Sequence, residues 1–287
     1  MTNSEYYLGL YEKAMPDVSF EEKLMLTKEC GFDYMEISID ETDKKLSRLD
    51  SPETVAQIRE AIEKTGVPIL TMCLSGHRKY PLGSHSEETR ERSLCIMSKA
   101  VDLAAAVGIR IIQLAGYDVY YEEGDGTTLR LFEENLEKAV RMAAKKGVLL
   151  GFETMETPFL DTVEKGMVHV NRVNSPYLGM YPDIGNLKNA AVLYGHDVTT
   201  DLKAGKGHTF ASHLKETKPG LYRDMLFGQA DGHTEYDRCL DVLCADGVRM
   251  FTGEFWYHGE ENYKENIVSA SVFLRNKIEK AIERTCN

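Results

Sequence analysis

The chain has 287 residues, of which 43% are hydrophobic, and it carries a formal net charge of −12 at pH 7. A chain of this length can bury the core of an α/β barrel, so we expect a single domain spanning residues 1–287. The excess of acidic residues disfavours a nucleic-acid partner, because the phosphate backbone attracts basic proteins.

The sequence lacks the two kinds of apolar segment that direct a chain to or across a membrane. No apolar run approaches the roughly 18–20 residues that span a bilayer. The first residues, M-T-N-S-E-Y-Y, do not have the basic segment followed by an apolar one that is typical of a signal peptide. We therefore expect no membrane partner and a cytoplasmic location.

Strand-like and helix-like segments alternate along the chain. Short runs rich in β-branched, aromatic and other apolar residues predict strands over residues 6–12, 32–39, 68–74, 109–115, 148–154, 178–183, 210–216 and 248–255. Helical spacing follows each of them, over residues 19–30, 53–65, 87–107, 128–146, 161–174, 187–202, 236–245 and 263–284. Ser19 and Glu22 form a capping-box pattern at the first helix. Eight strand and helix units predict a (β/α)8 TIM barrel.

A doubly wound open sheet is the alternative fold for such an alternation. Folds of that class usually carry a glycine-rich phosphate-binding turn after the first strand. The end of the first predicted strand and the residues that follow it read G-L-Y-E-K-A-M, which offers no such turn. The pattern therefore favours the barrel.

Four of the predicted strands end in a side chain that can bind a metal, namely Glu153, Asp183, His213 and Glu254. Their separations of 30, 30 and 41 residues suit neighbouring units of one barrel, whose strand ends meet at one rim. Two glutamates, one aspartate and one histidine form a hard set of oxygen and nitrogen ligands. We expect one divalent metal ion there, zinc or manganese in the first place, with magnesium and cobalt as further candidates.

Each of these residues also has a purely structural explanation. Asp183 could cap the next helix, His213 could be a core histidine, and the two glutamates could be surface acids. The joint position of all four at strand ends favours a metal, because an isolated acid near the interior of a barrel is costly. Small residues such as Gly151 and Ala211 precede the ligands on the same side of their strands, which leaves room for a cavity above a packed floor.

Other polar residues near strand ends are candidates for binding a substrate. Arg78, Lys215 and Lys218 follow predicted strands and suit a phosphate or a sugar oxygen, with ordinary solvated charge as the alternative. Glu36 ends another predicted strand. It is a candidate for accepting hydrogen bonds from sugar hydroxyls, or for a structural pairing with an arginine.

Several motifs, spread over nearly the whole chain, together resemble one known family. They are G-L-Y-E-K-A, G-F-D-Y-M-E-I-S-I-D-E-T-D, C-L-S-G-H-R-K-Y-P-L-G-S, I-Q-L-A-G-Y-D-V-Y-Y, Y-P-D-I-G-N-L and H-L-K-E-T-K-P-G. In these motifs the chain resembles the L-xylulose 5-phosphate 3-epimerases, also called L-ribulose 5-phosphate 3-epimerases, of the xylose-isomerase-like barrels. The resemblance implies a part in the breakdown of L-ascorbate or L-xylulose. Barrels of this kind often self-associate, and we expect a homodimer.

The resemblance also implies roles for individual residues. The family's metal-ligand pattern falls on Glu153, Asp183, His213 and Glu254, and in related ketose 3-epimerases the two glutamates are also the acid/base pair. The substrate-site residues that it implies are Glu36, Arg78, Glu156, Asn186, Lys215 and Lys218. The chain departs from the family at F-G-Q-A-D-G-H-T, where Gln229 stands in place of an acid and the loop at 228–233 is longer.

These expectations combine into one enzymatic hypothesis, a metal-dependent epimerase that inverts C3 of a ketopentose 5-phosphate. It would convert L-xylulose 5-phosphate to L-ribulose 5-phosphate through a cis-enediolate. Glu153 and Glu254 would remove and return the proton on opposite faces of the sugar. The alternatives are an aldose–ketose isomerase acting on a sugar or sugar phosphate with the same metal site, and a sugar-phosphate binding protein without catalysis.

Overall fold

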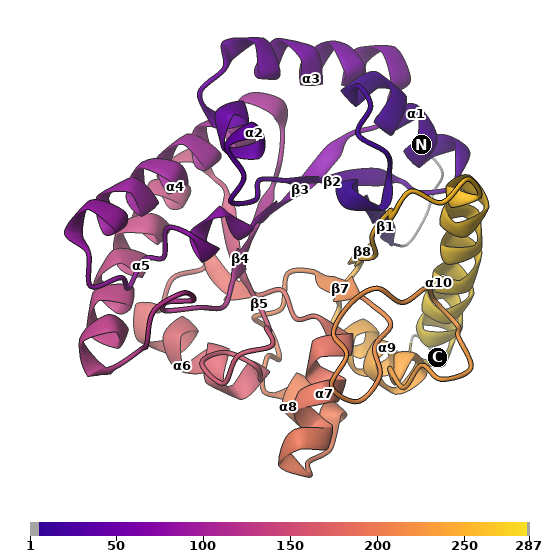
Figure 1. Ribbon diagram of the computed structural model, residues 1–287. Coiled ribbons are helices and arrows are strands. Elements are labelled where there is room, and N and C mark those ends of the chain that lie inside the picture. The colour runs from indigo at the N-terminus through magenta and orange to yellow at the C-terminus, as the bar shows by residue number, and fades with distance from the viewer. Residues whose placement is uncertain (1–5, 286–287) are drawn as a thin grey trace.

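The structure is a computed structural model in which residues 6–285 are described. Eight parallel strands lie around the centre and helices surround them, which is the architecture of a (β/α)8 barrel (Figure 1). The strands are β1 Tyr7–Tyr11, β2 Tyr34–Ser38, β3 Ile69–Leu74, β4 Ile111–Ala115, β5 Leu149–Glu153, β6 Leu178–Met180, β7 Ser212–Leu214 and β8 Met250–Gly253. None of the helices within the described range has the length and apolar content that a membrane-spanning helix needs.

The helices connect successive strands on the outside of the barrel. They are α1 Phe20–Glu29, α2 Asp43–Leu46, α3 Pro52–Thr65, α4 Glu87–Val107, α5 Gly126–Lys146, α6 Val163–Val173, α7 Ile184–Tyr194, α8 Val198–Lys203, α9 Tyr236–Ala245 and α10 Tyr263–Thr285. Short 3-10 turns lie at Glu12–Ala14, Ser47–Leu49 and Ser75–Arg78. The short helix α2 and these turns have no counterpart in the predicted elements.

Side-chain caps explain where two of the helices begin, and one of these caps was predicted from the sequence. The capping box at α1 is confirmed, because Ser19 Oγ accepts from Glu22 N and Glu22 Oε2 accepts from Ser19 N. The expectation of one helix over residues 187–202 is wrong. Gly195 adopts a left-handed conformation with φ 68° and ends α7, and Asp197 then caps α8 by accepting from two backbone N–H groups.

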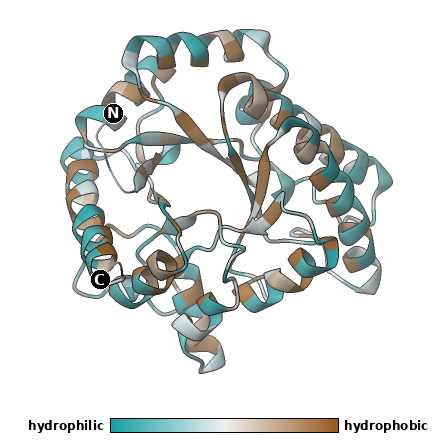
Figure 2. Ribbon diagram, turned by 180° about the vertical axis from the view of Figure 1, so that it is seen from behind, coloured by the Kyte–Doolittle hydropathy of each residue, from teal (hydrophilic) through white to brown (hydrophobic). Residues whose placement is uncertain are grey.

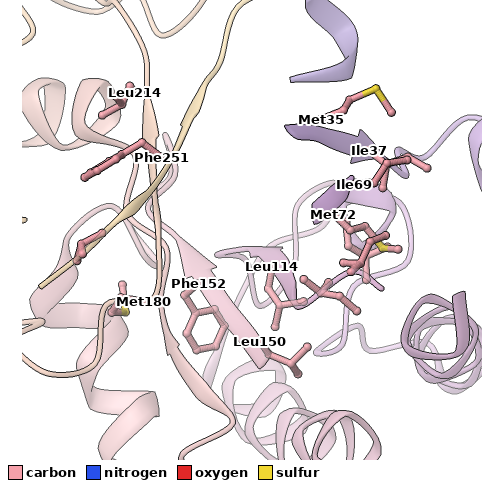
Figure 3. Close-up of a cluster of buried hydrophobic side chains, with 14 of the residues drawn as sticks. Met35, Ile37, Ile69, Met72, Leu114, Leu150, Phe152, Met180, Leu214 and Phe251 are labelled. Atoms are coloured by element: carbon pink, nitrogen blue, oxygen red, sulfur yellow. The ribbon is translucent and has the colours of Figure 1, made fainter. Parts of the chain in front are cut away.

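One set of alternate strand residues points away from the barrel axis and packs under the helices. Met35 and Ile37 of β2 and Leu150 and Phe152 of β5 are fully buried in this layer, which continues around the barrel (Figure 3). Hydrophobic and hydrophilic residues alternate along the outer helices, as expected for helices with one face on this core and one in water (Figure 2).

The other set of strand residues faces the barrel axis. Tyr34 of β2 and Tyr181, directly after β6, are fully buried there. A Cβ atom at Gly9 would lie 2.3 Å from the Tyr34 ring, and one at Gly151 would lie 2.9 Å from Tyr181 Cβ. Gly9 of β1 and Gly151 of β5 therefore leave room for the two tyrosine side chains. The tyrosine rings form a packed floor below the strand ends.

The barrel closes between β6 and β7. The other neighbouring strands pair as ladders in the order β6-β5-β4-β3-β2-β1-β8-β7, whereas β6 and β7 are joined by isolated parallel bridges. One bridge pairs Met180 with Thr209 and the other pairs Asp183 with His213. Two of the predicted metal ligands thus lie on the seam of the barrel.

Candidate metal centre

The four predicted ligands converge at the carboxyl-terminal rim of the barrel. Glu153 ends β5, Asp183 lies directly before α7, His213 is in β7 and Glu254 follows β8. One nitrogen or oxygen atom from each lies within 4.8 Å of those from the other three. The residues are 4%, 0%, 0% and 5% exposed, in the same order. The strand ends therefore bring four donors into one buried cluster.

The chemistry of the cluster suits a divalent cation. Three carboxylates and one imidazole supply hard oxygen ligands and one nitrogen. Asp183 Oδ2 is buried and receives no hydrogen bond of good geometry from the described residues, although Lys215 Nζ lies 3.2 Å away. Lys215 supplies one positive charge to three buried acids, and a divalent cation could balance the remaining negative charge and bind this oxygen. These residues fit a metal ion.

The pKa values of the acids reflect their crowding in a buried place. Burial raises the pKa of Asp183 to about 7, with Glu254 and Glu153 adding to the shift and Lys215 opposing it. Burial and the neighbouring Glu254 also raise the pKa of Glu153. Burial works against the ionisation of Glu254, but Lys215 and His213 outweigh it and lower its pKa. A bound divalent cation would favour the ionised form of all three acids.

Neighbouring groups hold the ligands in place. Asp183 caps α7, since its Oδ1 accepts from Asn186 N at 2.7 Å, and its own N–H donates to Thr154 Oγ1 at 3.1 Å. Gln113 Nε2 donates to Glu153 Oε2, and Lys215 Nζ donates to Glu254 Oε2 at 3.0 Å. The capping explanation of Asp183 and the ligand hypothesis are therefore compatible, because each uses a different oxygen of the carboxylate.

A pocket opens above the cluster at the rim where barrel enzymes place their active sites. Two of the four candidate ligands, Glu153 and Glu254, line it directly. Four of the substrate-site residues predicted from the resemblance line it as well: Arg78, Glu156, Asn186 and Lys215. The remaining walls are formed by Tyr11, Lys13, Cys73, Ser75, Met155, Tyr222, Arg223 and Trp256.

Arg78 and Glu156 are linked through two tyrosines. The Arg78 guanidinium lies 4.8 Å from the centre of the Tyr120 ring and donates to Tyr117 OH at 3.3 Å. Tyr117 OH and Tyr120 OH donate to the two oxygens of Glu156 at 3.1 and 3.3 Å. Arg78 Nε is buried and has no hydrogen-bond partner among the described residues. The arginine is thus positioned, and its buried Nε–H group is left over for a ligand.

Asn186 and Lys215 lie at the base of the pocket. Asn186 is 2% exposed and donates from Nδ2 to Thr154 O at 2.8 Å, while its Oδ1 has no partner among the described residues. Lys215 is 5% exposed and lies between Asp183 and Glu254. Both residues are close enough to the cluster to touch a substrate bound to it.

The structure places two predicted substrate-site residues outside the pocket. Glu36 is completely buried below it, where Oε1 lies 2.6 Å from His213 Nε2, so it is not placed to accept from sugar hydroxyls. Lys218 points to solvent and pairs with Asp231 at 3.0 Å. The longer loop at 228–233 is likewise absent from the pocket walls, to which residues 217–233 contribute only Tyr222 and Arg223.

Several polar residues that contribute to the site were not identified from the sequence, among them Arg223, Lys13 and Gln113. Arg223 lies in the irregular segment at 217–233, and only the path of that loop brings it to the pocket. Lys13 follows the first strand in the motif G-L-Y-E-K-A and pairs with Asp40 at 2.7 Å. Gln113 is an inward-facing residue of β4, and alternation along that strand was the available signal.

Comparison with known proteins places the chain in a family. A family model described as a xylose isomerase-like TIM barrel matches residues 24–276. Curated L-ribulose-5-phosphate 3-epimerases from Shigella sonnei (strain Ss046) and Escherichia coli O157:H7 are each 40% identical to this chain over 284 residues, with 98% of either chain covered.

Solved structures of sugar epimerases share the fold. A 3-keto-D-glucoside 4-epimerase from E. coli has a TM-score of 0.77 at 17% identity, covering 94% of this chain and 99% of that one. An L-ribulose 3-epimerase also has a TM-score of 0.77, at 16% identity, covering 98% of this chain and 96% of that one. The chain is therefore a carbohydrate epimerase that belongs to the L-ribulose-5-phosphate 3-epimerase family of xylose isomerase-like TIM barrels.

Proposed function

We propose that this epimerase interconverts L-xylulose 5-phosphate and L-ribulose 5-phosphate by inverting C3. The observation that carries the proposal is the buried cluster of Glu153, Asp183, His213 and Glu254 beneath a pocket that also holds Arg78 and Arg223. Such a site combines a place for a cation with charges that suit a phosphate. The name of the curated relatives supports the choice of substrate.

One divalent cation, zinc or manganese in the first place, would be held by the four residues of the cluster. A cation there would polarise the carbonyl group of the ketose and so make the proton on C3 more acidic. Lys215 adds a fixed positive charge at the base of the pocket, 3.0 Å from Glu254 Oε2. That ammonium group is suited to a sugar oxygen on which negative charge develops.

The acid and the base of the reaction are Glu153 and Glu254 in this proposal. They reach the pocket from β5 and β8, which are separated by β6 and β7 around the barrel. One removes the proton from C3 and the other returns a proton to the opposite face, and the roles exchange when the reaction runs backwards. Lys215 favours the ionised form of Glu254, which can then accept a proton.

The 5-phosphate is assigned to Arg78 and Arg223. A guanidinium group binds phosphate through two parallel hydrogen bonds and keeps its charge at any physiological pH. Arg78 has a free buried donor, and the Arg223 guanidinium lies 5.8 Å from the centre of the Trp256 ring. Aromatic contacts of this kind limit the movement of both side chains, so a phosphate would meet two oriented donors.

The test is proton NMR of L-xylulose 5-phosphate in deuterated water with the metal-loaded protein. We expect deuterium at C3 together with the appearance of L-ribulose 5-phosphate. Label at C1 with an aldose product would show an aldose–ketose isomerase instead. If none of the carbon-bound protons of the sugar exchanged with solvent, this result would contradict the proposed substrate.

The variant Glu254→Gln, with metal bound, tests the assignment of the acid/base pair. We expect exchange at C3 to fall by about 10²–10⁴-fold, the usual contribution of a positioned acid or base, while the sugar phosphate still binds. Retention of wild-type exchange in this variant would show that Glu254 does not transfer the proton.

A further inference from the structure

Glu36 is a buried carboxylate that lies below the pocket and contacts one of the four candidate ligands, His213. It is 0% exposed, and its Oε1 lies 2.6 Å from His213 Nε2. Its Oε2 accepts from Thr71 Oγ1 at 2.7 Å and from Tyr181 OH at 2.9 Å. Removing a carboxylate from water costs free energy unless the group is paired or hydrogen-bonded. The contacts with His213, Thr71 and Tyr181 offset that cost for Glu36.

The two nitrogens of the His213 ring face different surroundings. Nε2 faces Glu36, whereas Nδ1 lies 3.2 Å from Glu153 Oε1 and 3.5 Å from Glu254 Oε2. An imidazole that binds a metal is neutral and has a single proton. A carboxylate accepts a hydrogen bond from that proton, and Glu36 is the nearest carboxylate to the ring, so Nε2 keeps it. A cation among the candidate ligands would take the place of a proton on Nδ1, which points toward them.

A hydrogen-bonded row of residues from several strands holds Glu36 in its position. Tyr181 uses its single proton on Glu36, so its oxygen accepts from Thr252 Oγ1, which lies 2.8 Å away. Tyr34 OH lies 2.8 Å from the same threonine oxygen. The side chains in this row are all completely buried. Glu36 can therefore rotate away from His213 only by breaking the floor of the barrel.

We propose that Glu36 is a positioning residue that fixes the proton of His213 on Nε2 and so presents Nδ1 to the metal. The inference rests on the metal site of the proposed function and adds a residue that acts on the cation through a ligand. Carboxylates that accept from a metal-bound imidazole fix its tautomer and orientation and raise its basicity as a ligand. Glu36 then contributes to metal affinity without touching either metal or sugar.

The first test is calorimetric titration of Mn²⁺ into chelator-treated wild type and Glu36→Gln. The variant keeps the shape of the side chain, and we expect it to bind Mn²⁺ about 10–100-fold more weakly. Glu216→Gln is the matched control, because Glu216 is also a buried glutamate but its Oε1 accepts from the backbone N–H groups of Thr217 and Thr234. We expect its Mn²⁺ affinity to match that of wild type.

A second variant guards against a failure of Glu36→Gln to fold. Tyr181→Phe removes one donor to Glu36 and leaves the carboxylate in place. We expect Mn²⁺ affinity to fall by about 2–10-fold, because Glu36 keeps its contact with His213 and loses one of the two hydrogen bonds that hold its other oxygen. Wild-type affinity in both variants would overturn the inference. Absence of Mn²⁺ binding by wild type would overturn the metal site itself, which is a different result.

The tautomer gives a readout that a merely structural role would not change. Long-range proton–nitrogen NMR of zinc-loaded protein, labelled with ¹⁵N-histidine, distinguishes the two ring nitrogens, and His213→Gln assigns the signal. We expect the proton of His213 on Nε2 in wild type, with this signal altered in Glu36→Gln. A proton on Nδ1 in the loaded wild type would overturn the inference whatever the epimerase activity.

Discussion

Arg78 and Arg223 approach the same acid from two sides of the pocket. Arg223 Nη2 lies 3.6 Å from Glu156 Oε1, and Arg78 is linked to Glu156 through Tyr117 OH. Neither arginine forms a close bidentate pair with this carboxylate. A phosphate group can therefore bind to the guanidinium groups without first breaking a strong ion pair. The proposed phosphate site therefore predicts that a phosphorylated sugar binds more tightly than a free one.

Arg223→Met should separate recognition of the phosphate from the chemistry at C3. A hydrogen bond to a charged group is worth about 1.5–3 kcal/mol, so we expect kcat/KM for L-xylulose 5-phosphate to fall by roughly 10–100-fold through KM. Lys218→Met is the control. Lys218 is exposed and paired with Asp231, so its loss should change kcat/KM by no more than about twofold. Steady-state kinetics on both variants make the comparison.

The opposite ranking would contradict this assignment. If Lys218→Met raised KM and Arg223→Met did not, the phosphate would lie toward the loop at 228–233, where Lys218 meets Asp231. If Arg223→Met lowered kcat and kcat/KM equally and left KM unchanged, Arg223 would instead belong to the groups that act on the reacting carbons.

Residue type and spacing were sufficient to predict that the four candidate ligands would meet, but not how far below the rim each polar residue would lie. Parallel strands of a barrel bring their carboxyl ends to one rim, so Glu153 and Glu254 could be placed together from the sequence. The alternation of side chains along a strand shows which residues face the barrel axis, but it does not show how far below the rim each residue lies. Glu36 pairs across the sheet with Thr71 of β3, one layer below the ligands, and that depth depends on strand register.

At the scale of elements, the eight strands and the long helices were predictable from the sequence, whereas the short helices were not. α4 and α9 begin and end at the predicted residues, because their apolar spacing is sustained over several turns. α2 has four residues and owes its place to the cap at Thr42 and to packing, which leave little periodic signal. The break between α7 and α8 was missed although Gly195 and Asp197 are ordinary stop and start signals.

Asp183 serves α7 and the metal centre with different oxygens, and a substitution can separate the two roles. Asn caps helices about as well as Asp, so Asp183→Asn should leave the free energy of unfolding of the metal-free protein within about 1 kcal/mol of wild type. Asp183→Ala loses the cap as well and should cost about 0.5–2 kcal/mol. Denaturant unfolding in the presence of a chelator measures both.

The same variants should lose the stabilisation that a metal provides. Wild type in Mn²⁺ at 100 times the dissociation constant should gain about 2.7 kcal/mol over the chelated protein. Neither Asp183→Asn nor Asp183→Ala should gain a comparable amount at that concentration. Full stabilisation of Asp183→Asn by Mn²⁺ would show that Asp183 is a cap and not a ligand.

At the scale of the whole molecule, the metal centre lies across the closure of the barrel. Eight strands were predicted from the sequence, but the position of the seam between β6 and β7 was not. The seam arises because β6 and β7 are short and are joined by isolated bridges, which the sequence does not indicate. Three backbone hydrogen bonds cross it, from Met180 N to His208 O, Phe210 N to Met180 O and His213 N to Pro182 O. A cation held by Asp183 and His213 would join the two sides.

Hydrogen exchange should therefore report the metal at the seam. The amides of Met180, Phe210 and His213 donate across the seam and exchange only when it opens. Opening also separates Asp183 from His213 and so disrupts the proposed metal site. At 100 times the dissociation constant of Mn²⁺, these amides should exchange about 100-fold more slowly than in chelator, because the cation binds the closed state alone. Amides of the short surface helix α2, which open without disturbing the site, should keep their rates.

Asp183→Asn supplies the control for this measurement. Its seam has the same backbone, so its amides should exchange at one rate with and without Mn²⁺. Equal exchange rates in wild type with and without the metal would show that the cation does not join β6 to β7. Slowing at the seam in wild type alone would mean that a cation completes the least paired part of the barrel, because closure of the sheet and the proposed metal site use the same two residues, Asp183 and His213.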